Sequence, residues 1–145
     1  MTQVSSSKPL TRAQYKALAE FRYQLRRYLR HMEEKARAKR QHPQQYQLLL
    51  AITGLPAPKH PTISTLAERM QMNHNSMVEL VNRCEKSGLL KRARSSKDRR
   101  LVTLIITSKG DKVLRQQAQA SRQELLSIGP ILVGSLQRLI SRRLR

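Results

Sequence analysis

The chain has 145 residues, which is the size of one compact domain. Lysine and arginine number 29 against nine aspartates and glutamates, so the formal net charge is +20. A chain with so much charge of one sign repels itself and is expected to bind a polyanion. Nucleic acid is the first candidate and an anionic membrane surface the second.

The hydropathy pattern argues against a membrane protein. Unbroken apolar runs are short, as at 48–52, whereas a spanning helix needs about 20 apolar residues. The first ten residues contain no apolar segment of the secretory type, so we expect a cytoplasmic protein with no membrane contact. One Phe and no Trp leave few rings to stack on unpaired bases, which favours duplex DNA as the partner.

Residues 1–9 are expected to form a flexible tail. A helix with one apolar stripe is then predicted from Leu10, and its polar continuation at 33–41 is compatible with helix. An isolated helix of this kind would leave its apolar face in water, so a partner helix is expected. Pro43 suits a first helical position and opens a second predicted helix, which Gly54 and the prolines that follow it end. The stripe of the first helix steps by three or four residues through Leu18, Phe21, Leu25, Tyr28 and Met32.

Two helices joined by a tight connection come next. The first spans 62–70, with Thr62 or Ser64 as its cap, and the second spans 73–88, with Asn73 or Asn75 as its cap. Gly88 suits a left-handed C-terminal cap. The second helix has a packing stripe of Met77, Val81 and Cys84, and polar residues lie off that stripe at His74, Asn75, Ser76, Glu79, Asn82 and Arg83.

A hairpin and two final helices complete the prediction. The strands are 89–93 and 101–107, joined by "RSSKD" at 94–98, and Val102, Leu104 and Ile106 are expected to face the core. Thr107 or Ser108 caps the following helix. Gly129–Pro130 is predicted to break it, and a last helix then carries Leu132, Leu136, Leu139 and Ile140 on one face.

A short helix, a tight turn, a second helix and a hairpin are typical of a winged helix-turn-helix. The second helix would enter the major groove by its N-terminal end, where asparagine can pair with adenine. The basic hairpin tip would follow the duplex, with an arginine in the minor groove or on a phosphate. Asp98, alone among cations, is expected to bond an adjacent arginine side chain and hold it in one pose.

The stretch 62–110 resembles the DNA-binding core of the MarR family of bacterial transcription regulators. Its most specific part is "DRRLVTLIITSKG" at 98–110. The resemblance implies a fold that is mainly α with a small β-wing, and a homodimer whose N- and C-terminal helices interleave. Beyond the tail, 10–145 would be a single MarR-like domain, with dimerisation helices at 10–42 and 121–145 and a winged helix DNA-binding lobe at 43–120.

The resemblance also assigns residues to the two DNA contacts. Asn82 stands where the family often has aspartate, so a charged contact to a neighbouring arginine is expected to be missing. Cys84 stands where the family usually has leucine. The recognition helix would contribute Asn73, His74, Asn75, Ser76, Glu79, Asn82 and Arg83, and the wing Arg94, Ser95, Ser96, Lys97, Asp98, Arg99 and Arg100.

The function implied is sequence-specific regulation of transcription at a near-palindromic operator, by repression that a ligand relieves. Family members often bind phenolic or other small molecules, so a small-molecule ligand is a further implied partner. Tyr15, Tyr23, Tyr28 and Tyr46 are expected to pack in the dimer core, and the alternative is that they line a small-ligand pocket between the dimer region and the lobe. The net charge keeps a second hypothesis open, a basic architectural or RNA-associated protein with little sequence specificity. A weaker third is a module whose wing binds an acidic protein.

No residues with the spacing of a catalytic or cofactor-binding site are visible, so we expect neither an enzyme nor a bound cofactor. The histidines at 31, 42, 60 and 74 are scattered, without cysteine or carboxylate at metal-ligand spacing, so no metal site is expected. Cys84 lies on a packing stripe and is expected to be a core residue rather than a redox sensor.

Overall fold

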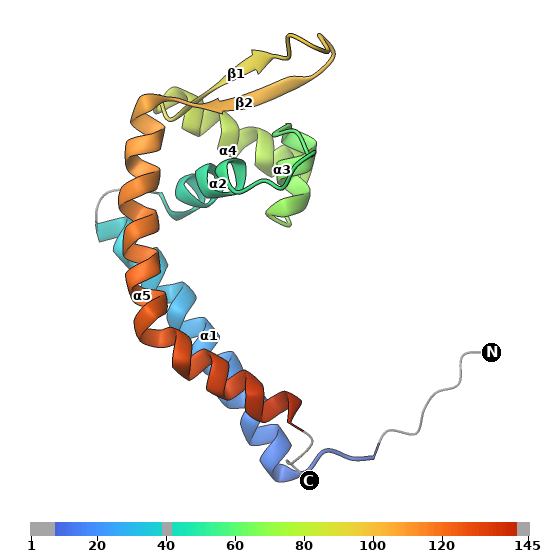
Figure 1. The fold of residues 1–145 in the computed structure, drawn as a ribbon, viewed down its shortest axis with the longest axis vertical. Helices are drawn as coiled ribbons and strands as arrows, with labels where there is room; N and C mark the ends of the chain where they lie inside the picture. The colour runs from blue at the N-terminus through green and yellow to red at the C-terminus, as the bar shows by residue number, and fades with distance from the viewer. Residues whose placement is uncertain (1–7, 39–41, 142–145) are drawn as a thin grey trace, which may run out of the picture. The chain divides into compact units, whose positions relative to one another are not determined.

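The computed structural model describes residues 8–38 and 42–141 (Figure 1). The predicted tail therefore lies almost wholly outside the described residues. Within them the chain is mainly helical with one small antiparallel sheet, which confirms the predicted fold class. The elements are α1 (Arg12–Ala38), α2 (Pro43–Thr53), α3 (Ile63–Arg69), α4 (His74–Lys86), β1 (Leu90–Arg94), β2 (Val102–Ile106) and α5 (Ser108–Ile140).

The chain divides into two compact units. Met32–Arg122 forms the first, which we call the winged unit, and it contains α2, α3, α4 and the hairpin. Met1–His31 and Gln123–Arg145 form the second, which we call the helical-pair unit because α1 and α5 supply its described residues.

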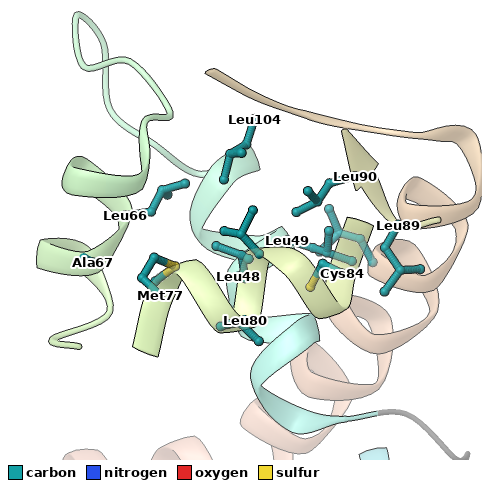
Figure 2. Packing of buried hydrophobic residues seen from close by; sticks show 12 residues of the cluster. Leu48, Leu49, Leu66, Ala67, Met77, Leu80, Cys84, Leu89, Leu90 and Leu104 are labelled. Carbon is teal, nitrogen blue, oxygen red and sulfur yellow. The ribbon is translucent and has the colours of Figure 1, made fainter. Parts of the chain in front are cut away.

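The winged unit has a leucine-rich core to which each of its elements contributes (Figure 2). Leu48 and Leu49 come from α2, Leu66 from α3, and Leu80 with Cys84 from α4. The hairpin adds Leu90 and Leu104, whose side chains point toward the helices. Full burial of such a side chain stabilises a fold by about 1.5–3 kcal/mol, so this core holds α4 and the hairpin in a fixed relation.

Polar caps set where the helices of the winged unit begin. The oxygen of Thr62 accepts a hydrogen bond from the Thr65 N–H at 3.2 Å, and that of Asn73 accepts from Ser76 at 2.8 Å. Thr107 does the same for the Gly110 N–H at 3.1 Å. In each case the structure selects the first of the two candidate caps in the sequence, because its side chain can reach an unpaired N–H of the first turn.

The junction between α4, β1 and α5 brings backbones very close together. Gly88 has φ +74°, a left-handed conformation that suits glycine, and the Leu89 N–H then donates to the Cys84 carbonyl at 2.9 Å. The Thr107 N–H donates to the Leu89 carbonyl at 3.1 Å. A Cβ atom at Gly110 would overlap that same carbonyl oxygen, so only glycine fits.

Two expectations about the C-terminal third are wrong. Helix α5 runs unbroken from Ser108 to Ile140 with Pro130 inside it, whereas a break was predicted at Gly129–Pro130. One proline costs about 3 kcal/mol through its missing N–H and its ring, and the hydrogen bonds of a 33-residue helix on both sides offset that cost. Val102 is exposed rather than in the core, because it pairs with Arg94 at the outer end of the hairpin, beyond the helices.

In the helical-pair unit, α1 and α5 lie side by side. His31 of α1 contacts Glu124 of α5 at 3.3 Å between Nε2 and Oε2. Among the described residues of this unit only Gln24 and Ser135 are buried, and both are polar. The unit therefore has no buried apolar core of its own among these residues.

Helix α1 begins with a reciprocal cap. The Thr11 hydroxyl accepts from the Gln14 N–H at 3.2 Å, and the Gln14 side chain accepts from the Thr11 N–H at 2.8 Å. No helix in the described ranges 8–38 and 42–141 is long and apolar enough to span a bilayer.

Candidate nucleic-acid interface

Helix α4 has one buried face and one polar face. Met77, Leu80, Val81 and Cys84 are buried. The opposite side has an exposed stripe at spacings of three or four residues, formed by Asn75, Glu79, Asn82 and Lys86. Lys86 extends this stripe and was not among the predicted site residues.

The first turn of α4 offers backbone and side-chain donors to solvent. Asn73 uses its Oδ1 atom for the cap, so only its NH₂ group remains for a ligand. His74 and Asn75 are exposed and Ser76 is half-buried. The N-terminus of a helix attracts anions because its N–H groups lack partners and its dipole is positive there. The arrangement can place amide and imidazole groups against base edges beside a phosphate.

The turn between α3 and α4 is short and closed by backbone bonds. Gln71 has φ +54°, and the Met72 N–H donates to the Ala67 carbonyl at 2.9 Å. The Gln71 side chain donates to the Glu68 carbonyl at 2.8 Å and so covers the end of α3. This local network fixes the angle at which α4 leaves α3.

The hairpin forms a wing with a closed tip. Strands β1 and β2 pair antiparallel, from Leu90 opposite Ile106 to Arg94 opposite Val102. The Ser95 N–H donates to the Leu101 carbonyl at 2.9 Å and closes the loop. The Arg94 side chain donates to the Arg99 carbonyl at 3.2 Å across the tip.

Asp98 orders the backbone of the tip rather than an arginine side chain. Its Oδ1 atom accepts from the Arg100 N–H at 3.0 Å, which is an Asx-type turn. In the described wing it forms no ion pair with an arginine. The expectation that Asp98 holds an adjacent guanidinium is therefore wrong, because the turn directs the carboxylate toward the main chain.

The other predicted wing residues present charge outward. Arg94, Lys97, Arg99 and Arg100 are exposed, and Ser96 is exposed beside them. Ser95 is half-buried, and its hydroxyl accepts from the N–H groups of Lys97 at 3.3 Å and Asp98 at 3.4 Å. The tip is therefore a cationic projection with a hydrogen-bonded backbone, and it can approach phosphate.

A three-residue network, which we call the Arg92 clamp, joins the wing to α4. The Arg92 guanidinium donates to Glu85 Oε1 at 2.9 Å and to Asn82 Oδ1 at 2.8 Å. The Arg92 N–H also donates to Glu85 Oε2, at 3.1 Å. Asn82 therefore does contact an arginine, through a neutral amide, and Glu85 supplies the charge.

The Arg92 clamp divides the predicted helix residues into two roles. Asn82 has its amide oxygen engaged by Arg92, whereas Glu79 and Arg83 are exposed. Sequence reasoning missed Arg92 and Glu85. Their signal was weak, since the two residues are seven apart and on different elements.

Cys84 is fully buried in the winged unit. Burial disfavours the charged thiolate and raises the pKa of the Cys84 thiol from 9.0 to about 11. The burial confirms the core position expected from the packing stripe, and the thiol is protonated and shielded near neutral pH.

Tyrosines divide between core and surface. Tyr46 packs against the core of the winged unit, and its hydroxyl lies 3.2 Å from that of Ser121. Tyr15 and Tyr23 are exposed in the single chain, so their predicted packing in a dimer core stays a prediction.

In the described residues no group of three or more His, Cys, Asp or Glu side chains could hold a metal ion.

The geometry of α3, the turn, α4 and the wing defines a winged helix-turn-helix protein. Comparison with known proteins shows which proteins this chain is similar to. Residues 42–101 match the model of the MarR family. A search of curated proteins finds no match.

Solved structures with the same fold include transcriptional regulators. BldR, a transcriptional regulator from Sulfolobus solfataricus, is 26% identical, with a TM-score of 0.61 over 92% of this chain and 99% of that chain. AbsC, a MarR family transcriptional regulator from Streptomyces coelicolor, is 18% identical, with a TM-score of 0.63 over 92% and 82%. A mutant of S. aureus MepR bound to an oligodeoxyribonucleotide is 19% identical, with a TM-score of 0.59 over 78% and 82%. The winged unit of this chain therefore matches the MarR family model over residues 42–101, and the chain shares its fold with solved transcriptional regulators.

Proposed function

We propose that this protein is a sequence-specific regulator of transcription that binds duplex DNA as a homodimer at a near-palindromic operator. The observation that carries the proposal is the exposed polar stripe of α4, held by a buried opposite face and flanked by a cationic wing. Such a stripe offers amide and carboxylate groups to base edges in a major groove, which is about 12 Å wide.

The predicted site residues take distinct parts in this proposal. His74, Asn75, Ser76, Glu79 and Arg83 contact bases or adjacent phosphates from α4. Arg99 and Arg100 contact the minor groove or its phosphates, with Arg94, Lys97 and Ser96 beside them. Asn73, Asn82, Ser95 and Asp98 act mainly by holding their neighbours in place, as their hydrogen bonds indicate.

The helical-pair unit supports the homodimer. Its large apolar side chains are exposed in the single chain, where water would contact them. A second copy that covered them would gain about 25 cal/mol for each Å² of apolar surface removed from water. The exposed residues that a second copy would cover are Leu10, Tyr15, Leu18, Leu25, Leu29, Leu125, Leu126, Ile131, Val133, Leu136 and Ile140.

The dimer is tested by light scattering after gel filtration. We expect the mass of two chains, and we expect Leu25→Glu to yield single chains or unfolded protein. Lys59→Glu, an equal insertion of negative charge in an exposed loop, should leave the dimer intact. A monomeric wild type at micromolar concentration would contradict this part of the proposal.

Selection of random duplexes at about 0.15 M salt, with excess competitor DNA, tests the function itself. We expect an enriched palindrome with half-sites about one helical turn apart. In the family, a ligand relieves repression, so candidate phenolic compounds would then be titrated against the selected complex. A repressor that responds to them releases the duplex.

A second candidate function rests on the net charge of +20. A protein with that excess can bind DNA or RNA through phosphates alone, as an architectural protein does. Strong retention of duplex without any enriched sequence would favour this candidate over the regulator.

A further inference from the structure

Helix α1 has three different sides in the helical-pair unit. One side is buried or half-buried and includes Gln24 and His31, the latter in contact with α5. A second side is apolar and exposed, with Leu18, Leu25 and Leu29. The third side is positively charged, and we call it the α1 basic face.

The α1 basic face consists of five exposed cations at helical spacing. Positions 12, 16, 23, 27 and 30 are successively four, seven, four and three residues apart, so they share one side of the helix, and position 26, four residues before 30, lies beside them. Tyr23 also lies on this side, and its ring centroid is 5.7 Å from the Arg27 guanidinium carbon. The members are Arg12, Lys16, Arg26, Arg27 and Arg30.

In α1 negative charge lies at the edge and at the C-terminal end of this face. Glu33 and Glu34 follow Arg30 by three and four residues, so Arg12, Lys16 and Arg27, which lie farther from them, carry the argument. Between Arg12 and Arg30 the only acid is Glu20, and its carboxylate accepts a hydrogen bond from the buried Gln24 side chain at 2.9 Å. Glu20 is thus directed to the edge of the face. The reciprocal cap of Thr11 and Gln14 orders the first turn, so Arg12 lies on a formed helix.

The length of the face fits a nucleic-acid backbone. Arg12 to Arg30 spans about 27 Å at a rise of 1.5 Å per residue. Duplex DNA carries a phosphate every 3.4 Å along each strand, so about eight phosphates of one strand pass along such a length. Five cations on one straight side can neutralise several of them.

We propose that the α1 basic face is a second, sequence-independent binding surface for the phosphate backbone of duplex DNA. It goes beyond the proposed operator contacts because it lies on the helical-pair unit, and none of its residues belongs to α4 or the wing. It adds affinity for any duplex and does not choose among sequences.

Other polyanions fit this face less well. Single strands are held by rings on which bases stack, and the face has only Tyr23, which already lies against Arg27. A membrane-binding helix inserts large apolar side chains beside its cations. Here the apolar residues lie on the other sides of α1, where α5 and the proposed second copy use them.

The first test is a salt titration of binding to a 30-base-pair duplex without the selected palindrome. The variant Arg12→Gln/Lys16→Gln/Arg27→Gln removes three charges from the face. The control Lys59→Gln/Lys112→Gln/Arg122→Gln removes three exposed charges from the winged unit. If the three residues contact phosphates, the slope of log affinity against log salt becomes shallower by about two to three in the first variant. The control keeps a slope close to that of the wild type.

The second test detects contact directly. Ala19 is exposed and lies on the basic face, three residues from Lys16 and four from Tyr23. In an Ala19→Cys variant a photoreactive group can be attached at this position, because the native Cys84 is buried. We expect crosslinks to the same duplex. The same group at Lys59→Cys should give few.

The outcomes separate this inference from the proposed function. An unchanged slope, an equal loss in the control, or absence of crosslinks from position 19 overturns the α1 surface and leaves operator binding intact. Binding to vesicles of anionic lipid can be measured with the same variants. If Arg12→Gln/Lys16→Gln/Arg27→Gln loses vesicle binding but keeps duplex binding, the α1 surface for DNA is also overturned. If the salt slope changes and crosslinks form, but the protein shows no sequence preference, the α1 basic face is supported and the proposed operator binding is contradicted.

Discussion

Gly110 is a residue on which the path of the whole winged unit depends. A Cβ atom there would overlap the Leu89 carbonyl, which also accepts the Thr107 N–H at 3.1 Å. We expect Gly110→Ala to lower the free energy of unfolding by about 3 kcal/mol, the upper part of the range for overpacking. Urea unfolding followed by circular dichroism measures this.

Gly134 provides the matched control for Gly110. It also lies inside α5, but apart from its chain neighbours and the backbone of its own helix no atom lies within 4 Å of the position of its Cβ. Gly134→Ala should therefore stabilise the protein by about 0.5–1 kcal/mol through helix propensity. Equal effects of the two substitutions would show that the Leu89 junction is not the cause.

Cys84 makes stability depend on alkaline pH. Burial raises its pKa from 9.0 to about 11, so the native state favours the protonated thiol. Its contribution is full below pH 9 and is lost as pH rises to about 11, at about 1.4 kcal/mol per unit.

Comparison with Cys84→Ala separates the pH dependence that the Cys84 thiol adds to the free energy of unfolding from that of other groups that titrate at high pH. Wild type should be more stable at pH 8, because alanine leaves a cavity, and its advantage should shrink towards pH 11. An advantage that is constant with pH, or rapid alkylation of the native thiol at neutral pH, would contradict the buried position.

At the scale of elements, the Arg92 clamp couples the wing to α4. Arg92→Met removes both side-chain bonds, and its partners are partly exposed, so we expect a loss of only about 1 kcal/mol. DNA affinity should fall more than this stability loss suggests, because the wing then moves relative to α4. Mobility shifts with the selected duplex measure it.

The Arg115–Asp111 pair is the matched control for the clamp. It has a similar distance, 2.9 Å, but joins two residues of one exposed helix turn. Arg115→Met should change stability by a few tenths of a kcal/mol and leave DNA affinity almost unchanged. If both substitutions weaken DNA binding alike, general charge rather than the clamp is responsible.

The wing tip contributes a direct contact in this account. We expect Arg100→Ala to weaken binding to the selected duplex and to make the salt slope shallower by about 0.9, the value for one phosphate, while the dimer persists. Lys59→Ala removes one exposed charge elsewhere and should have a smaller effect. Unchanged affinity of Arg100→Ala at matched salt would remove Arg100 from the interface.

At the scale of the whole molecule, local chemistry was predictable and long-range context was not. The caps at Thr62, Asn73 and Thr107 follow from side chains that reach their own first turn. The break predicted at Pro130 is wrong because the helix on both sides of this residue keeps α5 continuous. Asp98 was misassigned because its partner depends on the shape of the tip, and the Arg92 clamp requires knowledge of how β1 returns to α4.

Parallel selection with wild type and Asn75→Ala tests the central claim that α4 selects sequence. Asn75 is exposed on the first turn, where it can pair with a base edge. The account predicts a palindrome for the wild type. In Asn75→Ala we expect the same palindrome with relaxed preference at one position in each half-site, worth about 1–3 kcal/mol of discrimination. An identical motif from both proteins, or no motif from either, would contradict recognition by this face of α4.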